Sequence, residues 1–325
     1  MQKIVVVQPL RPEALRLFEE RPDIEFEVVT DFSPDNLLRH ISDADALTIR
    51  DAPLPVQVLQ AAARLRVISR HGVGYDNIPV EYCTSRGLPV TVVGDVNAVS
   101  VAEQTMFLLL AAAKRGLELD AAVRRGDFAA RSRLVGLELR NRTILVIGFG
   151  RVGREVAARA GAFGMRVIAF DPFVKGEAVP DALFVDSLDD GLRQADVVTV
   201  HIPLGPKTRG LLGAREIGLL PSRAIVLNTA RGGILDEDAV VAGLDSGKLW
   251  AAGLDTFETE PLKPDSPLIK NRRVVLSPHS AALTEESLVA MGVMTARNAL
   301  AGLDGSLDPA LVVNRSVLEA EEDAR

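Results

Sequence analysis

The sequence predicts an α/β protein with two domains, each built on a doubly wound parallel sheet. The chain has 325 residues, about twice the ~150 residues of a typical domain. Short β-branched runs alternate with amphipathic helical stretches along most of its length. Such alternation is typical of parallel strands that are joined by crossover helices.

Five strands and their helices are expected in residues 1–98. The strands are predicted at residues 3–7, 25–29, 46–49, 66–69 and 89–93. Two of the helices are predicted at residues 12–20 and 35–41, with Ser33 as the candidate N-cap of the second. These units predict one small doubly wound domain.

A long apolar helix is expected over residues 97–117, where few polar residues interrupt the sequence. A helix that is apolar nearly all round is buried on most sides. Residues 124–142 are rich in Arg, Gly and Asp and show no clear period. We therefore expect a connector there.

A second α/β unit follows this connector. Its strands are predicted at residues 143–147, 166–170, 182–185, 197–201, 224–228, 251–254 and 274–277. A last helix is expected over 285–302, followed by a strand-like segment at 311–313 and a solvated acidic tail at 319–325.

Composition excludes several classes of protein. The 37 basic and 44 acidic side chains give a net charge of −7, and no basic cluster offers a footprint for nucleic acid. The longest apolar run, 106–113, is far shorter than the ~20 residues that cross a bilayer. The run 4–7 is interpreted as a strand and not as a signal peptide, so a cytoplasmic protein is expected. Cys83 is the one cysteine, and the four histidines lack metal-binding spacing, so no metal site is expected.

The most informative segment runs from a strand through a glycine-rich turn into a helix. It contains Gly148-Phe149-Gly150-Arg151-Val152-Gly153. In such a turn the first glycine permits a tight bend, the second lets the backbone approach a pyrophosphate, and the third lets the helix pack close to the strand. The helix N-terminus suits the negative charge of the phosphates. This pattern predicts a dinucleotide site.

Asp171 strengthens the prediction of a dinucleotide site. It follows the expected strand at 166–170 and lies 18 residues after Gly153, close to the usual offset of a ribose-binding acid. A carboxylate there accepts hydrogen bonds from ribose hydroxyls and repels a 2′-phosphate, so we expect NAD rather than NADP. The alternative is a turn-capping aspartate before Pro172.

Three polar residues follow later strands, at the edge where doubly wound sheets bind ligands. They are Arg231, Glu260 and His279. A planar cation, a carboxylate and a proton donor of near-neutral pKa suit hydride transfer to a 2-oxo acid.

Alternatives to these three assignments stay open. Arg231 could cap a helix, and Glu258 competes with Glu260. Among the other histidines, His40 is expected at the surface, while His71 and His201 could each bond a carbonyl at a strand end.

The sequence resembles the D-isomer-specific 2-hydroxyacid dehydrogenases over essentially its whole length. The resemblance rests on several separated motifs in the family's order. They are Ser-Arg-His-Gly-Val-Gly-Tyr-Asp-Asn-Ile at 69–78, Asn-Ala-Val-Ser-Val-Ala-Glu at 97–103, the glycine turn at 148–153, His-Ile-Pro-Leu at 201–204 with Thr-Arg-Gly-Leu at 208–211, Asn-Thr-Ala-Arg-Gly-Gly at 228–233, and residues 255–261.

This resemblance implies a flavodoxin-like substrate domain and a Rossmann NAD-binding domain. The first would comprise residues 1–98 and 296–325, and the second residues 99–295. The activity it implies is NAD-dependent interconversion of a small 2-oxo acid and its D-2-hydroxy acid. His279 would exchange a proton with the substrate oxygen, Glu260 would stabilise the imidazolium, and Arg231 would hold the carboxylate.

The resemblance also implies a set of binding residues. The cofactor set is Gly148, Gly150, Arg151, Val152, Gly153, Asp171, Ile202, Pro203, Thr208, Thr229, Ala230 and Asp255, with Asp255 on the nicotinamide side. The substrate set is Arg50, Val73 and Gly74, the last two through backbone N–H groups. The helix from Asn97 and the arm at 119–139 resemble the two-fold interface of the family, so a homodimer is expected.

The sequence departs from the family pattern in a few places. Ala281 and Ala282 stand where glycines are frequent, and Leu145 replaces a frequent glycine. Glu260 argues against formate as a substrate, because formate dehydrogenases pair their histidine with glutamine. Asp51 follows Arg50 where phosphoglycerate enzymes commonly carry a small hydroxylated residue, which puts a phosphorylated substrate in doubt.

Two rival functions remain. An NAD-sensing, corepressor-like interaction protein would keep the same Arg, Glu and His. An amino-acid dehydrogenase or a homocysteine-type hydrolase would share the two-domain plan, but the lysine expected near the acid/base is missing.

Overall fold

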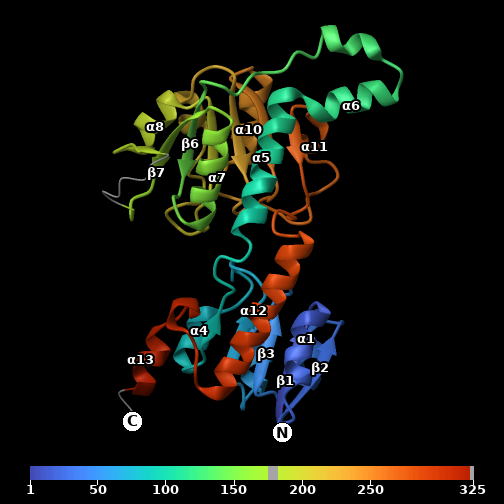
Figure 1. The fold of residues 1–325 in the computed structure, drawn as a ribbon, viewed down its shortest axis with the longest axis vertical. Coiled ribbons are helices and arrows are strands. Elements are labelled where there is room, and N and C mark those ends of the chain that lie inside the picture. Colours follow the sequence, from blue (N-terminus) through green and yellow to red (C-terminus); the bar gives the residue numbers. More distant parts are fainter. Residues whose placement is uncertain (175–181, 323–325) are drawn as a thin grey trace. The chain divides into compact units, whose positions relative to one another are not determined.

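The computed structural model describes residues 1–174 and 182–322, and the chain divides into two compact units (Figure 1). Unit 1 comprises Met1–Asn97 and Thr284–Arg325, and unit 2 comprises Ala98–Leu283. Each unit contains one parallel sheet with helices on its faces, which confirms the predicted fold class.

Unit 1 has a five-stranded sheet in the order β2-β1-β3-β4-β5. The strands are β1 (Gln2–Val7), β2 (Ile24–Val29), β3 (Ala46–Ile49), β4 (Val67–Arg70) and β5 (Val90–Thr91). The helices are α1 (Pro12–Glu19), α2 (Pro34–Ile41), α3 (Val56–Ala61), α4 (Val80–Ser85), α12 (Glu285–Asp304) and α13 (Ser316–Glu322).

The two faces of this sheet follow from the alternation of side chains along β1. Ile4 and Val6 lie in one core with residues of α1 and α12, whereas Val5 and Val7 lie in the other with residues of α2 and α3. All four side chains are fully buried or nearly so. A strand that is covered on both faces explains the unbroken apolar run at the start of the chain.

Unit 2 has a seven-stranded sheet in the order β12-β11-β10-β9-β6-β7-β8. The strands are β6 (Thr143–Ile147), β7 (Arg166–Phe170), β8 (Leu183–Phe184), β9 (Val197–Val200), β10 (Ala224–Asn228), β11 (Leu249–Leu254) and β12 (Val274–Leu276). The helices are α5 (Ala98–Lys114), α6 (Gly116–Arg124), α7 (Arg151–Ala162), α8 (Leu188–Gln194), α9 (Ala214–Leu219), α10 (Glu237–Asp245) and α11 (Pro267–Lys270).

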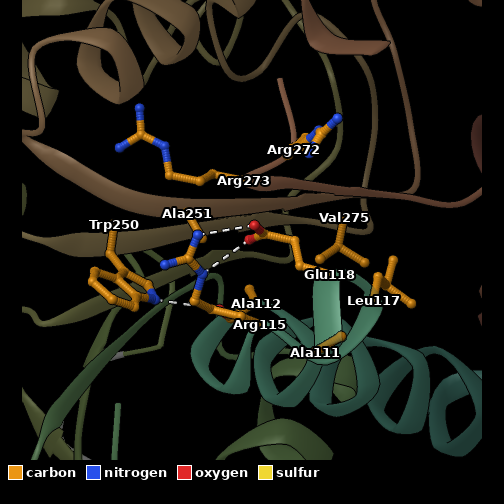
Figure 2. Close-up of a pocket in the computed structure, with 10 residues that line it drawn as sticks. All are labelled: Ala111, Ala112, Arg115, Leu117, Glu118, Trp250, Ala251, Arg272, Arg273 and Val275. Carbon is orange, nitrogen blue, oxygen red and sulfur yellow. Dashed lines mark hydrogen bonds and ion pairs between the residues drawn. The ribbon is translucent and has the colours of Figure 1, made fainter. Parts of the chain in front are cut away.

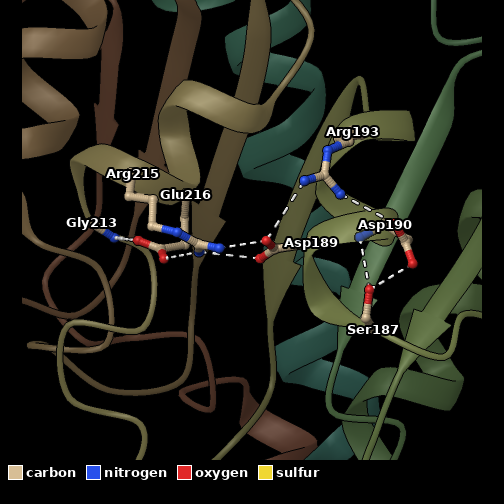
Figure 3. Close-up of polar contacts among 7 residues, drawn as sticks. All are labelled: Ser187, Asp189, Asp190, Arg193, Gly213, Arg215 and Glu216. Carbon is tan, nitrogen blue, oxygen red and sulfur yellow. Dashed lines mark hydrogen bonds and ion pairs between the residues drawn. The ribbon is translucent and has the colours of Figure 1, made fainter.

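An exposed polar network joins α8 to α9 (Figure 3). Asp189 of α8 forms an ion pair with Arg215 of α9, and Ser187 caps α8 by accepting a hydrogen bond from Asp190 N at 3.1 Å. Glu216 accepts a hydrogen bond from Gly213 N at 3.1 Å and so closes the first turn of α9. Exposed ion pairs contribute only ~0–1 kcal/mol each, so the buried core is the main source of stability.

Several predicted elements differ from the structure in detail. Ser33 is at the N-cap of α2, but its side chain makes no capping hydrogen bond. The strand-like segment expected at 311–313 is confirmed only in part: Pro309–Leu311 is a 3-10 helix, but Val312 forms an antiparallel bridge with Thr91 and Val313 N donates to Val90 O at 2.8 Å. Glu319 lies in α13, so the tail does not begin there, and residues 323–325 lie outside the described residues.

The long apolar helix is shorter than expected and less buried. It ends at Lys114, because Arg115 adopts a left-handed conformation with φ of 54° and α6 starts a new axis. Val99 and Phe107 on α5 are 47% and 49% exposed. The expected connector contains a 3-10 helix, Phe128–Ser132.

The second crossing between the units lies at residues 283 and 284, and not at the expected 295 and 296. The reason is that α12 is one continuous helix that packs on α1, β3 and β4. A boundary at residue 296 would cut this helix in half.

Within residues 1–174 and 182–322, no helix combines the length and the apolar character that a bilayer crossing requires.

Candidate active site

The predicted cofactor and catalytic residues follow neighbouring strands of unit 2. They come after β6, β7, β9, β10, β11 and β12, and all of these strands are parallel. Their carboxyl ends therefore meet at one edge of the sheet, which is where this class of fold binds ligands.

The glycine turn after β6 cannot carry side chains at two positions. Gly148 has φ of +90°, and a Cβ there would lie 2.5 Å from the carbonyl oxygen of His201. A Cβ on Gly153 would lie 2.1 Å from the carbonyl oxygen of Gly148. Both contacts are impossible for real atoms, so these glycines allow α7 to start directly against β6 and β9.

Gly150 and Asp171 fit a dinucleotide. A Cβ on Gly150 would meet no atom within 4 Å, so the backbone there faces open space. Gly150 is also the N-cap of α7 and forms no side-chain cap, which leaves N–H groups of the first turn, at Arg151 and Val152, available to a pyrophosphate. Asp171 Oδ2 accepts a hydrogen bond from Phe149 N at 2.8 Å, so its carboxylate lies at the mouth of the turn.

His279 and Glu260 form a hydrogen-bonded pair. Nδ1 of His279 lies 2.8 Å from Oε2 of Glu260, and both side chains are partly exposed. The other carboxylate oxygen of Glu260 accepts a hydrogen bond from Phe257 N at 3.0 Å. Because Nδ1 is bound to Glu260, Nε2 is the ring nitrogen left to exchange a proton with a ligand.

The carboxyl group of Glu260 is held in its charged form. Partial burial acts to raise its pKa, but the hydrogen bonds from His279 and Phe257 N and the positive charges of His279 and Arg231 outweigh that effect. The pKa of Glu260 therefore lies below its ordinary value. An ionised carboxylate at this position stabilises a protonated imidazole.

Arg231 lies in a loop that presses against the loop of Glu260. A Cβ on Gly232 would lie 1.8 Å from the carbonyl oxygen of Phe257, so the two backbones touch at this glycine. Asn228 fixes the Arg231 loop, since its side chain donates to Arg231 O at 2.7 Å and accepts from Ala230 N at 3.0 Å. This packing brings the guanidinium of Arg231 into the electrostatic environment of Glu260.

Asp255 holds the turn that carries His279. This side chain is fully buried, and it accepts hydrogen bonds from Ser280 N and Ala281 N, each at 2.9 Å, and from the hydroxyl of Ser277. Its backbone oxygen accepts from His279 N at 2.7 Å. His279 has a positive φ of 50°, a conformation that costs energy for a side chain with a Cβ. The cluster around Asp255 supports that conformation.

Sequence reasoning missed Ser277 and Gln104. The Ser277 hydroxyl donates to Asp255 and accepts from the side-chain amide of Gln104 at 3.0 Å. A hydroxyl between the last strand and Pro278 was a usable signal for Ser277. Gln104 lies 173 residues away from its partner in the sequence, so only the fold brings it there.

Two predicted cofactor residues use their hydroxyl groups within the protein. Thr208 Oγ1 donates to Pro203 O at 2.7 Å and accepts from Gly205 N at 2.8 Å, which closes the loop after β9. Thr229 Oγ1 lies 2.8 Å from Thr105 Oγ1 of α5 and is buried. Ile202 and Ala230 lie in the loops next to them and are partly buried. Their cofactor contacts stay predictions.

The alternatives to His279 and Glu260 point elsewhere. The Glu258 carboxylate faces α10, where its Oε1 accepts from Glu237 N at 3.5 Å, and Glu258 N donates to Glu237 Oε1 at 2.7 Å. Burial lowers the pKa of His201 to about 3. His40 lies 3.2 Å from Glu27 in unit 1. Within residues 1–174 and 182–322, His279 is the one histidine paired with a carboxylate at the carboxyl edge of the unit 2 sheet.

The predicted substrate residues belong to unit 1. Arg50 follows β3, and Val73 and Gly74 follow β4, so they lie along the carboxyl edge of that sheet. Val73 is 40% exposed. Burial, followed by the charges of Arg50 and Arg70, lowers the pKa of His71 to about 4, so this ring is neutral at physiological pH.

A pocket of about 180 Å³ lies at the opposite edge of the unit 2 sheet (Figure 2). It is lined by the start of β11, the start of β12 and the end of α5, including Trp250, Arg273 and Ala112. Arg115 and Glu118 form an ion pair across it at 2.9 Å. Since Trp250 lies near the start of β11 and Arg273 directly precedes β12, the pocket is separate from the edge that carries His279.

Comparisons with known proteins identify the family to which the chain belongs. Residues 106–281 match the family model described as D-isomer specific 2-hydroxyacid dehydrogenase, NAD binding domain. The chain is 41% identical over 310 residues to D-3-phosphoglycerate dehydrogenase of Methanocaldococcus jannaschii, covering 94% of this chain and 58% of that protein. It therefore spans little more than half of that relative.

Two further proteins match the chain from end to end. Glyoxylate reductase of Aeropyrum pernix is 38% identical over 331 residues, with 98% of each chain covered. The crystal structure of the TT0316 protein from Thermus thermophilus superposes with a TM-score of 0.88 at 34% identity, covering 96% of this chain and 100% of that one. Family match, relatives and fold agree, and this chain belongs to the D-isomer specific 2-hydroxyacid dehydrogenases.

Proposed function

We propose that this chain is an NAD-dependent oxidoreductase that interconverts a small 2-oxo acid and its D-2-hydroxy acid. The observation that carries the proposal is the pair formed by His279 Nδ1 and Glu260 Oε2 at 2.8 Å. This pair lies at the same sheet edge as a glycine turn whose backbone is open to a dinucleotide. Both curated relatives are named as enzymes of 2-oxo or 2-hydroxy acids, which supports turnover rather than a corepressor-like role.

Each residue has a distinct part in this reaction. NADH, when bound, supplies a hydride to the carbonyl carbon, and NAD accepts it in the reverse direction. Nε2 of the His279 imidazolium gives its proton to the carbonyl oxygen, while Nδ1–H stays bonded to the Glu260 carboxylate. Arg231 holds the substrate carboxylate through its planar guanidinium. Arg50, Val73 and Gly74 complete the proposed substrate contacts.

NAD preference over NADP is part of the proposal. The Asp171 carboxylate at the mouth of the turn accepts from Phe149 N and Phe173 N, each at 2.8 Å. A fixed negative charge there accepts from ribose hydroxyls and repels a 2′-phosphate.

Association into a homodimer is also part of the proposal. Unit 2 exposes an apolar set on α5, α6 and the arm that follows. Its members are Val99, Phe107, Leu117, Val123, Phe128 and Val135, between 47% and 66% exposed. Exposed apolar side chains in such number mark a surface that binds another protein, and a second copy fits the expected two-fold interface.

The activity is tested by following NADH oxidation with glyoxylate, hydroxypyruvate and 3-phosphohydroxypyruvate. We expect turnover with at least one of them, and hydroxypyruvate should give D-glycerate when the product is resolved by a chiral method. An L-product, or NADH binding without turnover of any of a broad panel of 2-oxo acids, contradicts the proposal.

A further inference from the structure

Unit 1 carries a charged cluster at the point where its strand order reverses. The chain passes from β1 to β2 on one side and then to β3 on the other side of β1. In doubly wound sheets ligands bind at the carboxyl ends of the strands that flank such a reversal. Here those strands are β1 and β3, which end at Val7 and Ile49.

A polar bridge joins the ends of β1 and β3. Gln8, directly after β1, donates a hydrogen bond from Nε2 to Oδ1 of Asp51. The amide oxygen of Gln8 accepts from Asp51 N and Ala52 N, each at 3.1 Å. Gln8 itself has a positive φ of 69°, so its backbone takes an uncommon conformation where it meets this loop.

The loop after β3 is also held from its other side. Asn77 donates from its side-chain amide to Ala52 O at 2.7 Å and to Arg50 O at 3.1 Å. Gln8 therefore binds the backbone N–H groups of Asp51 and Ala52, and Asn77 binds the backbone carbonyl groups of Arg50 and Ala52. The Asp51 carboxylate is therefore fixed in position, although it is exposed.

Two arginines lie within electrostatic reach of this carboxylate. Burial acts to raise the pKa of Asp51, but the hydrogen bonds from Gln8 and from its own backbone and the charges of Arg50 and Arg70 outweigh that effect and lower it. Asp51 is thus ionised at neutral pH. Arg70 closes β4, and its guanidinium lies against Gly72 and donates to His71 O at 2.6 Å.

The balance of these charges limits what this edge of unit 1 can bind. Arg50 and Arg70 carry two positive charges and Asp51 carries one negative charge, while the His71 ring is neutral. Asp51 therefore cancels part of the positive charge that a phosphate at this edge would need, whereas the substrate carboxylate is assigned to Arg231. A phosphate would add about two negative charges beside the Asp51 carboxylate, which its hydrogen bonds to Gln8 hold in place.

We propose that Asp51, fixed by Gln8, selects for 2-oxo acids with a single negative charge and against those that also carry a phosphate. This proposal rests on the proposed function and names its substrate class. It makes Asp51 a specificity-determining residue and Gln8 the residue that positions it.

Hydroxypyruvate and 3-phosphohydroxypyruvate form a matched pair of substrates, because they differ only by the phosphate. We would measure kcat/KM for both with wild type, Asp51→Asn and Asp51→Ser. The control is Asp43→Asn, which removes the same charge at the opposite end of β3, where Asp43 pairs with Lys3 at 2.8 Å. Turnover of hydroxypyruvate reports that each variant is folded.

The wild type should prefer hydroxypyruvate. Both Asp51 variants should raise the relative kcat/KM for the phosphorylated substrate by about tenfold, whereas the control should change it by less than about twofold. Added salt should narrow the discrimination of the wild type. An Asp51 variant that behaves like Asp43→Asn overturns the proposal.

Binding measurements distinguish a failure of this proposal from a failure of the proposed function. Affinities of D-glycerate and 3-phospho-D-glycerate for the NADH-loaded protein can be read from NADH fluorescence. If the Asp51 variants differ from wild type in these affinities but no 2-oxo acid is turned over, the result supports the charge selection and contradicts the proposed function. Turnover with unchanged selectivity supports the function and contradicts the selection, and a wild type that binds neither acid contradicts both.

Discussion

The hydrogen bond between His279 and Glu260 decides which ring nitrogen of His279 is left to handle the proton of the proposed reaction. Glu260 is ionised, since its pKa lies below its ordinary value despite partial burial. It therefore accepts from Nδ1–H of His279 at 2.8 Å and fixes the tautomer of the ring. The remaining nitrogen, Nε2, is the one that we propose exchanges a proton with the substrate oxygen.

Replacing Glu260 by glutamine should move the pH profile of reduction. The negative charge of the carboxylate stabilises a protonated imidazole, and glutamine lacks that charge. The falling limb of kcat for 2-oxo acid reduction should therefore shift toward acid pH. In wild type the Glu260 carboxylate stabilises the imidazolium at neutral pH, and this effect is lost as the pH falls through the lowered pKa of Glu260. A profile identical to wild type contradicts the pairing.

Replacing Asp171 by alanine should weaken NAD binding and favour NADP relative to it. The carboxylate has two partners in the protein, Phe149 N and Phe173 N, so Asp171→Asn is the matched variant that keeps an acceptor without the charge. Dissociation constants for NADH and NADPH, measured by fluorescence, check this. An unaltered ratio of the two in both variants excludes repulsion of the 2′-phosphate by Asp171.

At the residue scale, the sequence could predict the position of side chains that directly follow a buried strand, and their roles stay proposals. The glycine turn, Asp171 and the trio Arg231, Glu260 and His279 follow strands that can be predicted from their apolar runs. Ser277 and Gln104 could not be found, because their role depends on a contact between β12 and α5. Asp255 was expected to face nicotinamide, yet its carboxylate is already engaged by the turn around His279.

At the level of secondary structure, two loops of unit 2 contact each other and so bring the proposed catalytic residues Arg231 and Glu260 to one place. The loop after β10 carries Arg231 and the loop after β11 carries Glu260, and they meet where Gly232 contacts Phe257 O. Neither loop could approach the other with a side chain at position 232. The site therefore depends on one glycine that takes no part in the chemistry.

Gly232→Ala should disrupt this contact. The added Cβ would have to displace the Phe257 carbonyl, which we expect to destabilise the protein by ~1–3 kcal/mol and to lower kcat at least about tenfold. The matched control is Gly161→Ala in α7, where a Cβ meets nothing within 4 Å and alanine should stabilise the helix by up to ~1 kcal/mol. Urea unfolding and steady-state kinetics check both. Equal behaviour of the two variants contradicts the role given to Gly232.

Strand prediction succeeded where a strand is buried on both faces. The bounds of β3, β6, β7 and β10 agree with the expected residues, because their apolar runs end abruptly. The sheet edge β5 contains only Val90–Thr91, although the apolar run is longer. The length of an edge strand is set by its hydrogen bonding to the neighbouring strand and not by hydrophobicity. Such pairing cannot be inferred from the sequence of one segment.

At the scale of the whole molecule, each unit buries its own core and presents its strand ends to a ligand. Unit 2 in addition exposes apolar side chains on α5 and the arm. The sequence predicted two α/β units but not their second boundary. That boundary depends on which sheet the α12 helix packs against, and the apolar positions of one helix do not reveal its partner.

Phe128→Asp should weaken the proposed homodimer. Phe128 is 66% exposed in the arm of unit 2, and a charge there would be buried on association. Light scattering coupled to size exclusion should show wild type at about twice 34.9 kDa and the variant shifted toward monomer. Phe32→Asp, at a 42% exposed site of unit 1, is the control. A monomeric wild type refutes the dimer.

The central claim, that the imidazole of residue 279 handles the proton of the reaction, is tested most directly by His279→Ala. With a 2-oxo acid that wild type reduces, we expect kcat to fall by at least about 10²-fold while NADH affinity stays within about twofold. His40→Ala, which removes a histidine paired with Glu27 in unit 1, should retain wild-type turnover. A His279→Ala variant that turns over as fast as His40→Ala would contradict the account.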